Sequence, residues 1–249
     1  MRNIDQWRPS KFITTNGRMT GSRNRADVSV GSRLMCDIIA ACYESEIGKN
    51  VKGRLLDLGC GRVPLFEAYR AHVSENVCVD WENTLHTNEH LDFHCDLTGA
   101  LPLKDGEFNT VLLSDVLEHI PNPDHLFKEI ARLLCAGGRL LLTVPFFYWI
   151  HEAPHDYYRY TEFALRRFAA MSGLNVLQLK PLGGAPEILA DIIAKNIQRL
   201  PSVGNPLAML VQQSALAFIR TKPGGSLSMA TAKYFPLGYF LVAEKGPAT

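Results

Sequence analysis

The sequence lacks paired cysteines, long apolar runs and a strong net charge. None of the six cysteines forms a Cys-x-x-Cys pair, so we expect them to be reduced core residues of a cytosolic protein. The longest apolar runs, such as 140–150, are too short to cross a bilayer, and this one contains Pro145. The first residues also lack the apolar core of a signal peptide. We therefore expect a cytoplasmic protein that is either soluble or peripheral to the inner face of the membrane.

Charge is nearly balanced overall but unevenly placed. The net charge of +1 gives no strong signal for nucleic-acid binding. Residues 1–35, however, hold seven Lys and Arg against only Asp5 and Asp27. We expect a basic N-terminal arm over residues 1–30, which is either a solvated tail or a lid or anchor for an anionic substrate. The remaining length, 31–249, suits one well-filled domain with additions.

Apolar runs and helical spacing alternate along the chain. Because strands that alternate with helices form parallel doubly wound sheets, the predicted fold class is α/β. Ligands of such sheets lie beyond the carboxyl ends of the strands. A rather apolar helical insertion is expected at about 186–232. The predicted strands are 54–58, 76–80, 90–96, 109–114, 139–144, 174–179 and 239–243, and the predicted helices are 32–48, 65–72, 123–135, a helix between Thr161 and Gly173, and 186–220.

A glycine turn follows strand 54–58, in the pattern Asp57-x-Gly59-Cys60-Gly61. A triphosphate-binding loop needs Lys and then Ser or Thr after its last glycine, and neither follows here. A dinucleotide-binding loop needs a third glycine at the position where Pro64 stands. These absences argue against a nucleotide phosphate as the ligand of the turn.

Acidic residues end three of the predicted strands, at Asp57, Asp80 and Asp96. Three carboxylates along one edge of a sheet would repel a phosphate and attract a cation. S-adenosylmethionine (SAM) has no phosphate, and its amino group and sulfonium are both cationic. The charge of this edge therefore favours SAM over a nucleotide.

Two further motifs resemble those of class I SAM-dependent methyltransferases. These are SDVLEHIPNP at 114–123 and LLCAGGRL at 133–140, which look like the small-molecule enzymes of this class, including those of quinone and cell-surface glycan pathways. The resemblance covers about 50–180, and it departs at Val63, where a third glycine is common. It implies a Rossmann-like, doubly wound sheet of seven strands in the order 3-2-1-4-5-7-6, with strand 7 antiparallel and helices on both faces.

The resemblance also implies a role for each residue of the SAM pocket. Asp57 would orient the amino group of SAM, Asp80 would accept hydrogen bonds from its ribose, and Trp81 would lie against its adenine. The remaining contacts implied are the backbone of Gly59, Cys60 and Gly61 with the methionine part, Asp96 and Leu97 with the adenine, and Ser114 and Asp115 with the methionine and methyl region.

A second dense segment, 145–161, follows strand 139–144 and carries aromatic, His, acidic and Arg side chains. Such a mixture is typical of a site, although a packed loop held by an Arg159–acid pair would look similar. A hydroxyl acceptor would benefit from a base, and His suits that role near neutral pH. The candidates are His119, His151 and His155, with Asp156 as an orienting partner, and His155 is favoured because Asp156 adjoins it.

A metal-assisted variant is the alternative for the same residues. Asp115-x-x-Glu118-His119 with His151 or His155 resembles the ligand set of metal-dependent RNA 3′-end methyltransferases. Because Glu-His also occurs at this place in metal-free relatives, the leading prediction includes no metal.

The predicted function is methyl transfer from SAM to a small-molecule or glycan-precursor acceptor, at oxygen. The alternatives are a metal-assisted RNA 3′-end methyltransferase and a SAM-binding partner protein without catalysis. The apolar insertion would cover the substrate pocket, form a homodimer face, or make a peripheral membrane contact with Lys195, Arg199 and Arg220 at the lipid head groups.

Overall fold

The computed structural model describes residues 1–82 and 89–247. Its contacts divide the chain into two compact units, each formed by segments that are distant in the sequence. We call them unit 1 (Met1–Arg8, Glu46–Lys180 and Tyr239–Thr249) and unit 2 (Pro9–Ser45 and Pro181–Gly238).

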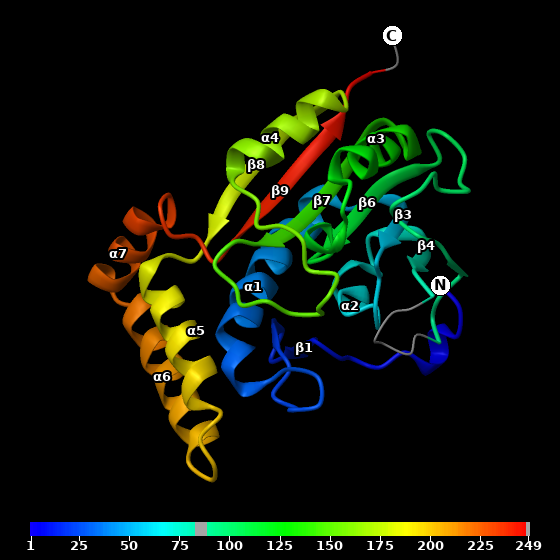
Figure 1. Ribbon diagram of the computed structural model, residues 1–249. Helices are drawn as coiled ribbons and strands as arrows, with labels where there is room; N and C mark the ends of the chain where they lie inside the picture. The colour runs from blue at the N-terminus through cyan, green and yellow to red at the C-terminus, as the bar shows by residue number, and fades with distance from the viewer. Residues whose placement is uncertain (83–88, 248–249) are drawn as a thin grey trace. The chain divides into compact units, whose positions relative to one another are not determined.

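A seven-stranded sheet dominates the fold (Figure 1). Its order is β5-β4-β3-β6-β7-β9-β8, and the pairs β4–β5, β3–β4, β3–β6 and β6–β7 are parallel. Renumbered within the sheet this is 3-2-1-4-5-7-6 with the seventh strand antiparallel, so the predicted fold class is confirmed. The strands are β3 Gly53–Leu58, β4 Val73–Asp80, β5 Phe93–His94, β6 Phe108–Ser114, β7 Leu134–Pro145, β8 Leu174–Leu182 and β9 Gly238–Lys245.

Helices cover both faces of this sheet. Leu55 to Leu58 in β3 are all buried, as expected for a parallel strand with a helix layer on each side. On one face, α3 (Pro123–Leu133) and α4 (Glu162–Met171) share a core with the strands, as Figure 1 shows. On the other face, Tyr69 of the short helix α2 (Phe66–Tyr69) reaches β3 and β4 through hydrogen bonds to Asp57 and Asn76.

Several predicted boundaries are wrong. Strand 90–96 shrinks to the two residues of β5, and helix 65–72 shrinks to α2. Helix 32–48 is observed as α1 (Arg33–Asn50), because Gly48 continues the helix instead of ending it. The pair Gly137-Gly138 lies inside β7, where a register shift against β6 absorbs it.

The first 30 residues contain ordered structure. Ile4–Gln6 forms a 3-10 turn (η1), and Phe12–Thr15 (β1) pairs with Arg18–Gly21 (β2) as an antiparallel hairpin. A second 3-10 turn, η2 (Val30–Ser32), precedes α1. The division into a basic arm at 1–30 and one domain at 31–249 stays a prediction.

The apolar segment predicted near 186–232 consists of three helices in unit 2: α5 (Ala185–Ile197), α6 (Gly204–Ile219) and α7 (Lys222–Ala232). Among residues 1–82 and 89–247, no helix has the length and apolar character that a membrane span requires.

Candidate cofactor and acceptor site

The glycine turn after β3 has the backbone that its sequence requires. Gly59 has φ +66°, and a Cβ there would lie 2.7 Å from the side chain of Val116. Only glycine fits both conditions. The amides of Gly59 and Cys60 donate to the carbonyl of Val79, so the turn is tied to the end of β4. Gly61 has φ +50°. At Gly59 and Gly61 no side chain projects from the turn, so a ligand can approach the backbone closely there.

Asp57 is buried at the end of β3. Its Oδ2 accepts a hydrogen bond of 3.2 Å from the hydroxyl of Tyr69 in α2. Burial raises the pKa of this carboxyl to about 7, the Tyr69 hydroxyl opposes the rise, and the nearby charge of Asp80 adds to it. The side chain is thus close to its titration point near neutral pH, where a cationic ligand would favour the ionised form.

Asp80, the last residue of β4, is tied to the same turn. Its Oδ2 accepts from the amide of Gly61 at 2.9 Å, and its Oδ1 accepts from the amide of Trp81 at 2.8 Å. The carboxylate is therefore fixed in orientation at the carboxyl edge of the sheet. The ring of Trp81 meets the ring of His155 edge to face, with centroids 5.0 Å apart.

Asp96 lies two residues beyond β5 and is exposed, with Oδ1 accepting from the amide of Thr98 at 2.8 Å. The prediction that Asp96 ends a strand is therefore wrong, because β5 stops at His94. Its neighbour Leu97 is buried in the core shared by the sheet and α3.

Ser114 and Asp115 stand where the chain leaves β6. The hydroxyl of Ser114 lies 3.2 Å from that of Thr143 in β7, and the amide of Asp115 donates to the carbonyl of Thr143. Asp115 has φ +53°, a strained conformation that turns the chain sharply at the sheet edge.

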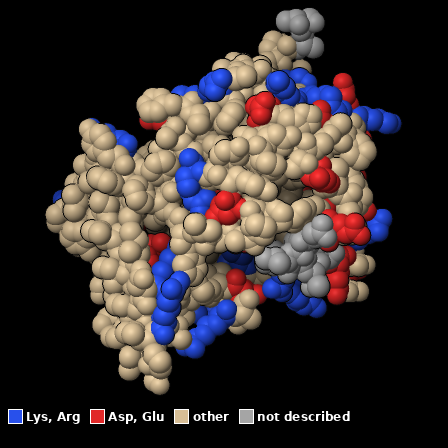
Figure 2. Space-filling view, in the orientation of Figure 1, with Lys and Arg blue, Asp and Glu red and all other residues tan. Residues whose placement is uncertain are grey.

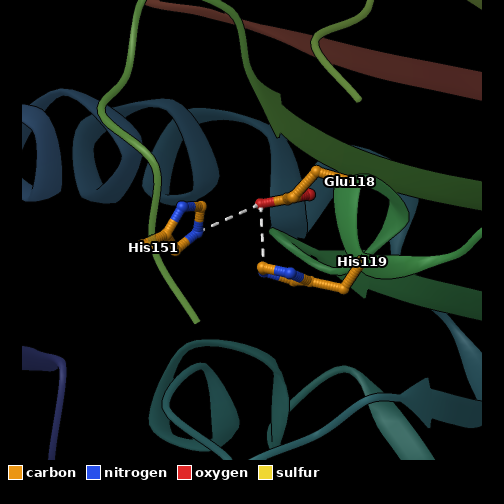
Figure 3. Close-up of side chains that lie close together, drawn as sticks. All are labelled: Glu118, His119 and His151. Atoms are coloured by element: carbon orange, nitrogen blue, oxygen red, sulfur yellow. Dashed lines mark ion pairs between the residues drawn. The ribbon is translucent and has the colours of Figure 1, made fainter. Parts of the chain in front are cut away.

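Three side chains from the two loops beyond β6 and β7 gather into one cluster (Figure 3). Glu118, fully buried in the 3-10 turn η3 (Leu117–His119), faces two imidazoles. Its Oε1 lies 3.7 Å from Nε2 of His119 and 3.8 Å from Nε2 of His151. One ligand atom from each residue lies within 4.8 Å of the others, a spacing that would let the three hold a divalent cation.

A hydrogen bond to Nδ1 fixes how the ring of His119 is oriented. Its Nδ1 lies 2.8 Å from the carbonyl oxygen of His155, which can only accept. In the neutral ring Nδ1 therefore carries the proton, and Nε2, which faces Glu118 and Glu152, has the lone pair.

Asp156 orients His151 instead of its neighbour His155. Its Oδ2 accepts from the amide of His151 at 2.9 Å and lies 3.3 Å from Nδ1 of that ring. A bidentate pair with Arg159, at 2.5 and 2.8 Å, holds the carboxylate in place. Burial opposes ionisation of Asp156, but the bonds from Arg159 and the His151 amide lower its pKa to about 2. Burial lowers the pKa of His151, and the neighbouring His119 lowers it further.

His155 has different neighbours. It is exposed and lies against Trp81, with Nδ1 3.2 Å from the hydroxyl of Tyr157. The four predicted catalytic residues thus separate into a group around Glu118, formed by His119, His151 and Asp156, and a position beside Trp81 for His155.

Hydrogen bonds to backbone carbonyls join the two loops that carry this cluster. The amide of Tyr157 donates to the carbonyl of Glu118 at 2.9 Å, and the hydroxyl of Tyr160 donates to the carbonyl of Leu117 at 3.0 Å. All of these residues belong to unit 1. The site is therefore built on one compact body.

The donor set of the turn fits SAM. Two buried carboxylates lie at the carboxyl edge: Asp57, two residues before Gly59, and Asp80, which accepts from Gly61. The one cation between 57 and 64, Arg62, is exposed. Such a site attracts an ammonium group or a hydroxyl and disfavours a phosphate.

A family model described as "Methyltransferase domain" matches residues 26–179, which is more than half of the chain. The chain belongs to this methyltransferase family. The predicted class, SAM-dependent methyltransferases, and the predicted cofactor, SAM, are thereby confirmed.

Among curated relatives, the methyltransferase is 27% identical over 143 residues to the ubiquinone biosynthesis O-methyltransferase of Dechloromonas aromatica, covering 52% of this chain and 54% of the relative. A protein of the same name from Coxiella burnetii is 28% identical over 103 residues, covering 37% and 44%. The chain thus spans about half the length of the curated relatives it matches.

Solved structures confirm the fold of the methyltransferase. The [4+2]-cyclase SpnF superposes with a TM-score of 0.53 at 15% identity, covering 96% of this chain and 87% of its own. A putative methyltransferase from Bacillus halodurans gives a TM-score of 0.51 at 14% identity, covering 83% and 98%.

Sequence reasoning missed two aromatic residues at this site. Tyr69 bonds to Asp57, and Trp7 bonds to the glycine turn. Tyr69 could have been found from its position at the end of the short helix that follows the glycine turn, since that helix packs against the strand that carries Asp57. For Trp7, 56 residues before its partner, the sequence carries no local signal.

Proposed function

We propose that the methyltransferase transfers the methyl group of SAM to a hydroxyl oxygen of a small-molecule or glycan-precursor acceptor. The observation that carries the proposal is the pair of Asp156 and His151, set beside His119 and Glu118 at the edge of the sheet that also carries the glycine turn. Such a group suits removal of a proton from a hydroxyl.

His151 is the residue we assign as base. Its lowered pKa keeps the imidazole neutral near pH 7, and a neutral ring can accept a proton. Asp156, with a pKa of about 2, stays ionised and favours a proton on the Nδ1 side, which leaves Nε2 as the accepting atom. His155, favoured from the sequence, instead suits a contact near the adenine through Trp81.

The glycine turn and its two acids would hold the cofactor. When bound, SAM supplies a methyl group on a sulfonium, and its transfer is an in-line displacement that depends mainly on alignment. Asp57 would attract the amino group, and Asp80 would accept from the ribose hydroxyls while its own orientation is held by Gly61 and Trp81. Asp96, which is exposed, is proposed to contribute less.

Cofactor binding is tested by calorimetry with S-adenosylhomocysteine (SAH). We expect Asp80→Ala to weaken SAH binding by roughly 10- to 100-fold, because hydrogen bonds to a charged acceptor contribute about 1.5–3 kcal/mol. Asp96→Ala serves as the matched control and should change the Kd by less. Absence of SAH binding to the unaltered protein would overturn the proposal.

The base is tested by methyl transfer to a panel of polyhydroxylated phenols and sugar glycosides. His151→Gln should lower kcat by roughly 10²- to 10⁴-fold at unchanged SAH affinity, the usual contribution of a general base. His155→Gln should lower kcat less. The reverse order would return the assignment to His155.

A metal-assisted reaction is the second candidate, and the spacing of Glu118, His119 and His151 favours it. A divalent cation held there would bind two vicinal hydroxyls of an acceptor and lower their pKa. EDTA followed by Mn²⁺ separates the two versions. Turnover that EDTA abolishes and Mn²⁺ restores supports the metal version, and turnover unaffected by EDTA supports the base alone.

We also propose a peripheral contact between unit 2 and an anionic lipid surface. Of the side chains in α5–α7, several large apolar ones are exposed, among them Leu189, Leu210 and Met229. Figure 2 shows the surface of these helices, at the left of the view, as largely uncharged. Within 181–238, all of which the structure describes, both acids are buried, while four cations are exposed, namely Arg199, Arg220, Lys222 and Lys233. This combination fits a lipophilic or lipid-linked acceptor.

A further inference from the structure

We propose that Trp7 is a positioning residue for the cofactor. Its indole N–H donates to the carbonyl of Val63. This bond stabilises the left-handed backbone of Val63 in the turn, a conformation that a glycine would adopt without help. The inference rests on the proposed function of that turn. It concerns Met1–Arg8 and Glu46–Lys180, which both belong to unit 1.

Val63 stands in the left-handed region, with φ +50°. A β-branched residue is unfavourable there, because its Cβ crowds the backbone carbonyl. Glycine avoids this crowding, and a third glycine is what the methyltransferase pattern has at this position. The strained conformation of Val63 persists only if its surroundings hold it.

Burial of the side chain and hydrogen bonds of the backbone hold Val63 in this conformation. Its side chain is fully buried, and its amide donates to the carbonyl of Cys60 at 2.8 Å, which closes the turn. Its carbonyl accepts from the amide of Phe66 at 3.2 Å and from Nε1 of Trp7 at 3.1 Å. The indole bond is buried, so solvent does not compete with it.

Trp7 also contacts the aromatic side chains that lead to Asp57. The rings of Trp7 and Phe66 meet edge to face at 5.2 Å, and Phe66 meets Tyr69 at 5.8 Å. The hydroxyl of Tyr69 donates to Asp57. One N-terminal side chain therefore supports both the turn backbone and, through packing, the carboxyl assigned to the amino group of SAM.

The first test is Trp7→Phe, which keeps a ring against Phe66 and removes the N–H donor. We expect the Kd for SAH to rise by roughly two- to tenfold, equivalent to about 0.4–1.4 kcal/mol. Hydrogen exchange of the amides at 60–66 should be faster in the ligand-free variant. A purely structural role would lower the melting temperature without either change.

The matched control is Thr110→Val. Thr110 is fully buried in β6 and donates to the carbonyl of Lys52 at 2.9 Å, away from the turn. The Thr110 hydroxyl also accepts from the amide of Lys52 at 3.0 Å, so the substitution removes two side-chain bonds to the backbone. It should lower the melting temperature while leaving SAH affinity and exchange at 60–66 unchanged.

A double substitution tests the part played by Val63. Glycine adopts φ +50° without strain, so Trp7→Phe should weaken SAH binding less in a Val63→Gly background than in the unaltered chain. Equal effects in the two backgrounds would overturn the link to Val63.

The outcomes separate the inference from the proposed function. If the unaltered protein binds no SAH, the proposed function fails, and the exchange at 60–66 in the ligand-free protein still tests Trp7. If SAH binds and Trp7→Phe changes neither its Kd nor that exchange, Trp7 is not a positioning residue.

Discussion

Asp57 combines two demands that oppose each other. Its position at the end of β3 brings a carboxyl to the cofactor edge, and the burial that comes with this position raises its pKa to about 7. Only the ionised form attracts an ammonium group strongly. Cofactor binding and stability should therefore depend on pH in opposite directions.

For binding, we expect the affinity for SAH to rise with pH between 6 and 8. With a pKa of about 7 in the free protein, the ionised fraction of Asp57 changes roughly tenfold over this range, and the Kd should follow it. Asp57→Asn is the control, because it keeps the shape and removes the titration. Calorimetry at three pH values on both proteins measures the difference, and parallel pH profiles would contradict the assignment.

For stability, the folded state holds a proton on Asp57 between about pH 4 and 7, whereas the unfolded state loses it. Stability from this residue therefore falls as pH rises through that window, by on the order of 4 kcal/mol. Asp57→Asn should be more stable than the unaltered protein at pH 8, and the advantage should shrink at pH 5. Urea unfolding at the two pH values checks this, and a constant difference between the proteins would refute it.

The strand-to-turn elements were the most predictable part of the site. Apolar runs that end in an acid predict Asp57 and Asp80 at the carboxyl ends of two strands, and the structure has them there, at one edge of the parallel sheet. The same pattern failed for Asp96, since β5 is too short to reach it. An edge strand of two residues is too short to show the alternation of apolar and polar residues from which a strand's end is predicted.

The loop after β7 was less predictable. Its residue types indicated a site, but adjacency in sequence paired Asp156 with His155. In the structure the amide of His155 donates to the carbonyl of Glu152, and this turn brings Asp156 back to His151. Glu118 completes the cluster from the loop after β6, a contact that no local pattern encodes.

Gly59 gives a test at the level of the β3 turn. Gly59→Ala adds a Cβ that would lie 2.7 Å from the side chain of Val116, in addition to the strain of φ +66°. Gly137→Ala has nearly the same φ, +69°, and no atom within 4 Å of the new Cβ. We expect Gly137→Ala to lose about 1–2 kcal/mol of stability, and Gly59→Ala to lose about 1–3 kcal/mol more.

Urea unfolding of both glycine variants measures these losses of stability, and calorimetry with SAH measures their cofactor affinity. SAH affinity should fall in Gly59→Ala alone, because the displaced turn carries the cofactor contacts. Equal losses of stability in the two variants would mean that Val116 moves away without cost, and that close approach is not the reason for glycine at 59.

For the molecule as a whole, charge and apolar surface are distributed unequally. Unit 2 carries ten Lys and Arg against five Asp and Glu, although the net charge of the chain is only +1. Two of those five acids, Glu187 and Asp191, are buried, and Asp191 pairs with buried Lys195 at 2.6 Å. Exposed apolar side chains of α5–α7 and exposed cations in or next to these helices therefore occur together within 181–238.

Vesicle sedimentation with the full chain tests what this surface contacts. We expect binding to phosphatidylcholine vesicles that contain phosphatidylglycerol, less binding to phosphatidylcholine alone, and release at 0.5 M salt, because surface charges are screened over about 4–5 Å there. Leu210→Glu in α6 should weaken binding, since Leu210 is 59% exposed. Phe163→Glu is the matched control, because Phe163 is 75% exposed on α4, outside unit 2.

The same variants distinguish a lipid surface from a second copy of the chain. An apolar helix face that binds lipid leaves the protein monomeric without vesicles, whereas a dimer face does not. Light scattering on the unaltered protein and on Leu210→Glu therefore accompanies the sedimentation. If Leu210→Glu converts a dimer to a monomer and anionic vesicles bind neither protein, α5–α7 form a homodimer interface, and the lipid contact is wrong. If the unaltered protein is monomeric and binds anionic vesicles through Leu210, the surface of α5–α7 contacts lipid and the homodimer interface is wrong.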